Sequence, residues 1–102
     1  MTEPVVPILH ATWSAVAVAA EPLGTAEVVA GARSRLGRAA ARISDGDVRA
    51  AIETLIMVGL VRVSWDGAGF ERGPTPPEAA RLTDAREVAW WRARRRAVRG
   101  AR

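Results

Sequence analysis

Apolar residues recur at helical spacing along most of the chain. An alanine- and valine-rich run keeps apolar positions three and four residues apart, which predicts a helix from Ile8 to Glu21 that Pro22 and Gly24 end. A second apolar stripe, beside a stripe of arginines, predicts an amphipathic helix over residues 25–42. Its internal glycines weaken that helix, and Gly37 is the candidate position for a break.

The clearest helix signal begins at Ser44. Ser44 and Asp47 have the spacing of a capping box, in which each side chain accepts a hydrogen bond from the other residue's backbone N–H. An apolar stripe follows, and Gly59 stands where a helix commonly ends in a left-handed residue. The pattern therefore predicts a third helix that starts just after Ser44 and ends before Gly59.

The periodicity changes after this helix. Residues 60–65 alternate as a strand rich in β-branched side chains, and a glycine-rich turn leads to a returning strand that starts at Phe70. Residues 79–82 could be a short strand or the start of the last helix. Thr83 is a suitable N-cap for a helix from about Ala85 to Arg99.

This order of elements predicts a mostly α-helical fold with a small β-hairpin, with a winged helix-turn-helix layout and an additional C-terminal helix. We expect an extended lead-in over residues 1–7, a folded unit over 8–83 and an arginine-rich helix over 84–102. The chain has 102 residues, enough for one domain. Alanine makes up much of the apolar content, so the core should be small and its helices closely packed.

The charge is carried almost entirely by arginine. Arginine supplies all 15 basic side chains, and the net charge is +4. The distribution is uneven: residues 1–70 hold 6 arginines and 7 acids, whereas residues 71–102 hold 9 arginines and 4 acids. Cysteine is absent and His10 is the only histidine, so we expect no disulfide, no metal site, no cofactor and no catalytic centre. These features argue against an enzyme.

Nothing in the sequence resembles a membrane or secretion signal. The longest uncharged run, residues 4–20, contains two prolines and a histidine and is poor material for a transmembrane helix of about 20 apolar residues. The first residues offer Glu3 rather than a basic side chain, unlike a signal peptide. We therefore expect a cytoplasmic protein with no membrane partner.

Two segments resemble a known family. The run Ser44-Asp-Gly-Asp-Val-Arg-Ala-Ala-Ile-Glu-Thr-Leu55, followed by Val58-Gly-Leu-Val61, resembles the third helix and first wing strand of bacterial winged-helix transcriptional regulators. Arg81-Leu-Thr-Asp-Ala85 resembles the end of the wing, and the PadR-like group is the most similar. The resemblance covers about residues 11–92. It implies a dimeric, sequence-specific DNA-binding protein whose third helix enters the major groove and whose last helix helps dimerisation.

The resemblance implies which side chains would contact double-stranded DNA. Arg49 and Thr54 would lie in the groove. The arginine stripe and the wing would hold phosphates through Arg35, Arg38, Arg42 and Arg72. The same third helix carries Asp45, Asp47 and Glu53, which repel phosphate. This departure raises the alternative of a winged-helix module that docks on an acidic protein partner.

The last helix carries a second candidate interface. Arg92, Arg95, Arg96 and Arg99 fall on one helical face, which fits a phosphate backbone, an acidic protein surface or plain solvation. Trp90 and Trp91 are adjacent and point about 100° apart, so one should pack on the core while the other anchors a partner, most simply in a homodimer. The two remaining tryptophans, Trp13 and Trp65, are predicted to lie in the core.

Overall fold

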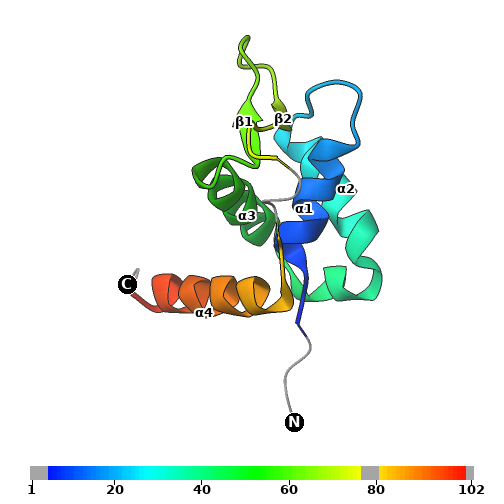
Figure 1. Cartoon of the computed structure of the whole chain (residues 1–102). Coiled ribbons are helices and arrows are strands. Elements are labelled where there is room, and N and C mark those ends of the chain that lie inside the picture. Colours follow the sequence, from blue (N-terminus) through cyan, green and yellow to red (C-terminus); the bar gives the residue numbers. More distant parts are fainter. Residues whose placement is uncertain (1–4, 77–80, 101–102) are drawn as a thin grey trace.

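The chain forms four α-helices, a short 3-10 helix and a two-stranded hairpin in the computed structural model, which describes residues 5–76 and 81–100. The fold class predicted from the sequence is confirmed, and the order of elements is the expected one (Figure 1). In chain order the elements are α1 (Ile8–Ala17), α2 (Thr25–Leu36), η1 (Gly37–Arg42), α3 (Asp45–Met57), β1 (Val61–Val63), β2 (Phe70–Arg72) and α4 (Asp84–Gly100).

The hairpin is antiparallel and is extended by one residue from a distant part of the chain. Val61 pairs with Arg72, and Val63 pairs with Phe70. Leu23, in the connection between α1 and α2, forms an isolated bridge to Phe70, with hydrogen bonds of 2.9 and 2.7 Å between their backbones. This bridge ties the start of β2, at the turn end of the paired strands, to the connection between α1 and α2.

Helix α1 lies at the centre of the helical body and contacts α2, α3 and β2. Its buried side chains join those of α2 and α3 in one apolar core, in which Ile8, Val28 and Leu55 are fully buried. The helices approach closely because small residues meet: a Cβ atom placed on Gly31 would lie 3.0 Å from the Cβ of Ala15. The alanine-rich composition thus produces tight helix packing with a small core, as expected.

The local end signals of the helices are confirmed at three positions. The Ser44 hydroxyl accepts a hydrogen bond from the Asp47 N–H, and the Asp47 carboxylate accepts one from the Ser44 N–H. Gly59 has φ +80°, and the break expected at Gly37 occurs there, at φ +56°, where η1 begins. The prediction for the first helix was too long, since α1 ends at Ala17 instead of Glu21.

The last helix starts beside the predicted N-cap. The Thr83 hydroxyl accepts a hydrogen bond from the Arg86 N–H at 3.3 Å. For residues 79–82 the sequence predicts either a short strand or the start of the last helix. Residues 81–82 belong to neither element, and residues 79–80 lie outside the described part of the chain. Residues 1–4 of the lead-in and 101–102 of the terminal segment also lie outside it.

The prediction that Trp65 lies in the core is wrong. Its side chain is 97% exposed, because β1 ends at Val63 and Trp65 stands in the turn beyond the paired strands. In that turn Asp66 accepts hydrogen bonds from the Ser64 hydroxyl and the Ala68 N–H, which close the turn locally. Trp13, in contrast, is partly buried against the core.

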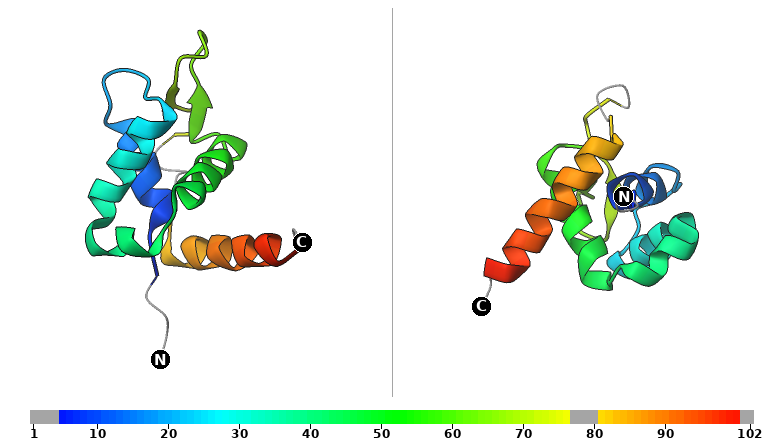
Figure 2. Two further views of the ribbon diagram at one scale, coloured as in Figure 1. Left: turned by 180° about the vertical axis from the view of Figure 1, so that it is seen from behind. Right: turned by 90° about the horizontal axis from the view of Figure 1, so that it is seen from below.

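Helix α4 crosses the end of the helical body that lies opposite the hairpin. The two turned views show it running beneath α3, away from the hairpin tip (Figure 2). Of its described residues only Glu87 is buried, so most of this 17-residue helix is open to solvent on several sides. No helix in residues 5–76 and 81–100 is long and apolar enough to cross a membrane.

Candidate nucleic-acid interface

Helix α4 has an inward face that holds it to the body. Glu87, Trp90, Trp91 and Arg94 follow one another at spacings of three, one and three residues, so they share one side of the helix. Each of the four makes a hydrogen bond to another element or segment of the chain. The inward face therefore fixes which side of α4 turns outward.

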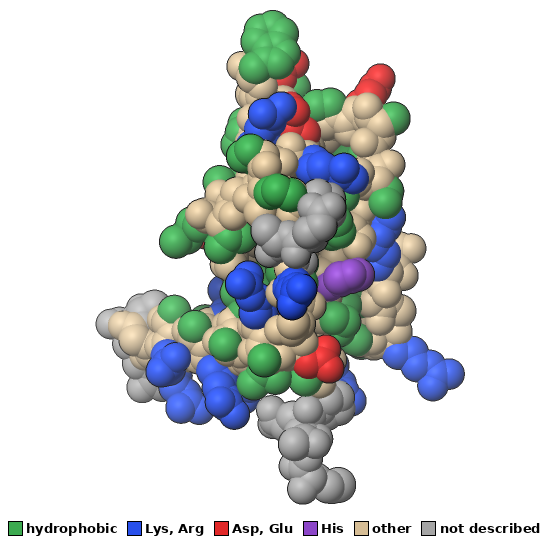
Figure 3. Space-filling view, viewed as in Figure 1, with side chains coloured by type: hydrophobic (Ala, Val, Ile, Leu, Met, Phe, Trp, Pro, Cys, Tyr) green, Lys and Arg blue, Asp and Glu red, His purple; other side chains and the backbone are tan. Residues whose placement is uncertain are grey.

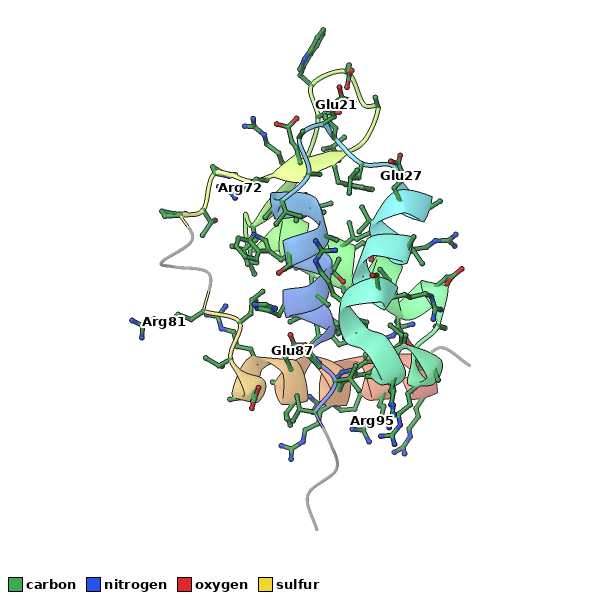
Figure 4. All side chains as sticks on the ribbon, turned by 90° about the vertical axis from the view of Figure 1, so that its right-hand side faces the viewer. Glu21, Glu27, Arg72, Arg81, Glu87 and Arg95 are labelled. Carbon is green, nitrogen blue, oxygen red and sulfur yellow. The ribbon has the colours of Figure 1, made fainter. Side chains whose placement is uncertain are left out.

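Glu87 caps the N-terminus of α1. Its carboxylate accepts hydrogen bonds from the Leu9 N–H at 3.0 Å and the His10 N–H at 2.9 Å. The residue before α1 is Pro7, which supplies no side-chain cap, so Glu87 meets two backbone donors from far along the chain. The side chain is 1% exposed, and this burial raises the pKa of Glu87 although the Leu9 and His10 N–H groups oppose the shift. Figure 4 shows Glu87 where α4 meets α1.

Both tryptophans of the last helix are engaged within the chain. Their rings meet edge to face with centroids 4.8 Å apart, and both pack against the core. The Trp90 Nε1–H donates to the Thr54 hydroxyl at 2.9 Å, and the Trp91 Nε1–H donates to the Val6 carbonyl at 3.1 Å. Both side chains are half-buried, in place of the one buried and one exposed ring that the sequence led us to expect.

Arg94 joins α4 to the start of α3. Its guanidinium forms an ion pair with the Asp47 carboxylate and lies 6.0 Å from the centroid of the Trp90 ring. Partial burial works against the charged form of Asp47, but hydrogen bonds from the Ser44 N–H and from Arg94 outweigh it and lower the pKa of Asp47. The Asp47 charge is thus compensated inside the protein, and this carboxylate takes part in both a helix cap and a tertiary contact.

The outward face of α4 is basic. Arg92, Arg96 and Arg99 are exposed, and none of the three forms an ion pair with a residue in the described ranges. Together with Ala89 and Arg95 they line a shallow hollow. Basic side chains gather along α4 in the space-filling view (Figure 3), and Arg95 lies at the same edge of the molecule (Figure 4).

The outward face of α3 is different in character. Arg49 and Glu53 are exposed, as is Asp45, whose carboxylate pairs with Arg33 at 2.9 Å. Met57, at the end of the helix, is 85% exposed. Thr54 does not face solvent freely: besides accepting from Trp90, its hydroxyl donates to the Ala50 carbonyl at 3.1 Å. Of the two side chains expected to read bases, only Arg49 projects from this face without such a contact.

The remaining predicted phosphate ligands lie on three different elements, α2, η1 and β2. Arg38 and Arg42 are exposed on η1, while the Arg35 guanidinium donates to the Gly31 carbonyl within its own helix. Arg72 donates to the Ala17 carbonyl at the far end of α1, at 3.2 Å. Figure 4 shows Arg72 near the hairpin and Arg95 at the opposite end of the molecule.

The structural roles of Arg33, Arg94 and Glu87 were missed by the sequence reasoning. Arg33 donates to the carbonyls of Ala40 and Ile43, at 3.0 and 3.1 Å, besides pairing with Asp45. It therefore holds η1 against the start of α3. A single sequence carries no signal for this contact, because an arginine in an arginine stripe looks the same whether it is solvated or bonded.

No family model, characterised protein or solved structure matches the chain. Residues 5–76 and 81–100 also contain no group of three or more His, Cys, Asp or Glu side chains that could hold a metal ion. The candidate site is therefore defined by its own geometry, which is a basic outward face on α4 and a mixed, partly apolar outward face on α3.

Proposed function

We propose that this protein is a DNA-binding transcriptional regulator of the winged-helix type, acting in the cytoplasm. The uncompensated arginines at the α4 end carry the proposal. Glu21, Glu27 and Arg72 lie at the hairpin end of the molecule, whereas Arg95 lies at the α4 end (Figure 4). Arginines are exposed on η1, α3 and α4, and Arg92, Arg96 and Arg99 have no ion-pair partner in the described chain. Uncompensated arginine along an exposed helix face favours a polyanionic partner.

Two further features are consistent with DNA as this partner. Three helices are followed by a hairpin that is bridged back to the α1–α2 connection, which is the layout expected of a winged helix. Arginine also matches phosphate geometry better than lysine, because its planar guanidinium donates two parallel hydrogen bonds. In this arrangement Arg49 is the side chain of α3 best placed to contact a base or a phosphate.

Selection from a pool of random duplexes tests this function. The full chain is mixed with the pool, bound duplexes are recovered, and the affinity of an enriched duplex is compared with that of a scrambled duplex at the same salt concentration. Specific binding is expected to exceed non-specific binding by a factor of about 10³ or more. Failure to bind any duplex at low salt would contradict the proposal.

The exposed apolar side chains favour a second candidate, a winged-helix module that docks on a protein. Met57, Val63 and Trp65 are 85%, 52% and 97% exposed, and they follow one another from the end of α3 into the hairpin. Exposed aromatic and methionine side chains are enriched at protein interfaces. In this case a single partner recovered with the wild-type protein should be lost on Met57→Glu with Trp65→Glu.

A homodimer remains part of the main proposal. A second α4 packed against the first would have to meet the Arg92–Arg99 face or the flank with Val98, which is 60% exposed. Two like-charged arginine faces repel each other, so the apolar flank is the better dimer contact. The mass in solution, measured by light scattering at several concentrations, distinguishes a dimer from a monomer.

A further inference from the structure

We propose that duplex phosphates bind across the outward face of α4, at Arg92, Arg96 and Arg99, rather than around α3 inserted in the major groove. This inference rests on the proposed function and assigns its principal contact surface. It departs from the expectation for the third helix of a winged-helix regulator.

The composition of the exposed part of α4 favours an anionic ligand. From Val88 to Gly100, α4 contains five arginines and no acidic residue. A helix that is merely solvated usually carries acidic and basic residues four apart, which stabilise it by pairing. Here Arg92 and Arg96 are four residues apart and repel each other. An anion on this face would relieve that repulsion.

The orientation of α4 on the body leaves its arginine face accessible. The contacts of Glu87, Trp90 and Arg94 lock one side of α4 onto α1 and α3. Helical spacing therefore places Arg92, Arg96 and Arg99 on the opposite side of α4, where all three are exposed. With a rise of about 1.5 Å per residue, these three arginines span about 10 Å along the helix. That span matches about three steps of a DNA strand, whose charges are spaced by about 3.4 Å along the axis.

Helix α3, in contrast, is poorly suited to the major groove. Its outward side offers Arg49 against Glu53, and it ends in the exposed, apolar Met57. The Thr54 hydroxyl is already bonded to Trp90 and Ala50. For α3 to enter the groove with Thr54 as a reader, the contact between α3 and α4 would have to open. Binding through α4 needs no such change.

Two triple variants with the same change in charge test the assignment. Arg92→Gln/Arg96→Gln/Arg99→Gln removes three charges from α4, and Arg35→Gln/Arg38→Gln/Arg42→Gln removes three charges from α2 and η1. The full-length variants are titrated with a fluorescent duplex at several salt concentrations. The tryptophan emission of each variant, compared with that of the wild type, verifies that α4 remains docked through Trp90 and Trp91.

We expect the α4 variant to reduce the magnitude of the slope of log K against log salt by about 2.7, the value for three lost phosphate contacts. The matched α2–η1 variant should change it by less than about 1. The inference is overturned when the wild type binds but the α4 variant keeps the wild-type slope, or when Arg49→Gln alone abolishes binding. Equal affinity for a poly-glutamate chain also overturns it, in favour of an acidic protein. Absence of wild-type binding to duplex at low salt refutes the proposed function itself.

Discussion

Removing the Glu87 carboxylate should destabilise the whole protein, although Glu87 lies on a largely exposed helix. In Glu87→Ala the backbone N–H groups of Leu9 and His10, whose hydrogen bonds are buried and partly buried respectively, lose the carboxylate of a residue that is 1% exposed. Each buried donor left without a partner costs about 1–3 kcal/mol, so the two together cost up to about 6 kcal/mol, and relief from burying the carboxylate offsets part of this. We therefore expect a loss of about 2–4 kcal/mol in the free energy of unfolding, measured by urea denaturation with tryptophan fluorescence.

Glu87→Gln refines this prediction, because its amide oxygen can accept only one of the two N–H bonds while the NH₂ group cannot accept. About half of the loss is expected. Glu71→Ala is the control: Glu71 pairs with Arg62, whose side chain is 60% exposed, and its loss should cost less than about 1 kcal/mol. A cost for Glu87→Ala no larger than that of Glu71→Ala would refute the role of Glu87 as the cap of α1.

The pH dependence of stability follows from the same contact. Burial raises the pKa of Glu87, so the folded protein binds a proton at this group more readily than the unfolded chain does. The contribution of Glu87 titration therefore favours folding at low pH and is lost as pH rises from the ordinary value of 4.5 through the raised pKa. Urea unfolding of Glu87→Gln across this interval should lack that component, whereas an unchanged pH profile would contradict it.

Three other changes test the fold. Gly59→Val should cost about 1 kcal/mol or more in urea unfolding, because φ is +80° there and a Cβ would lie 2.5 Å from the Thr75 hydroxyl; a neutral effect would show that this turn is not left-handed. Trp65→Glu should change the unfolding free energy by less than about 0.5 kcal/mol, as expected for an exposed side chain, and a large loss would mean that the ring is buried. The lowered pKa of Asp47 stabilises the fold above its ordinary pKa of 3.8, and this contribution is lost as pH falls through the lower folded value; Asp47→Asn should flatten that acid limb.

Features that depend on a few neighbouring residues could be predicted from the sequence. The Ser44–Asp47 capping box and the left-handed Gly59 both form within one turn of helix, so residue type and spacing define them. The same local reasoning placed the hairpin turn and the N-cap at Thr83. It failed at Trp65, because alternation of residue types continues past the point where backbone pairing of β1 ends.

Contacts between α4 and the body could not be predicted in this way. The positions of Glu87 under α1 and of Trp90 beside Thr54 depend on how α4 crosses α3, which no local pattern encodes. This crossing also decides which arginines are structural and which are exposed. Arg94 and Arg96 are two residues apart in one basic run, yet Arg94 pairs with Asp47 while Arg96 lies on the outward face.

The salt dependence of duplex binding by the wild-type protein measures how many phosphates its arginines contact. Binding is measured by fluorescence anisotropy of a labelled duplex over a series of salt concentrations, with the full chain. Three phosphate contacts from Arg92, Arg96 and Arg99 predict a linear plot of log K against log salt with a slope of about −2.7 or steeper. Binding that does not change with salt, or no binding to duplex at the lowest salt, would contradict the account.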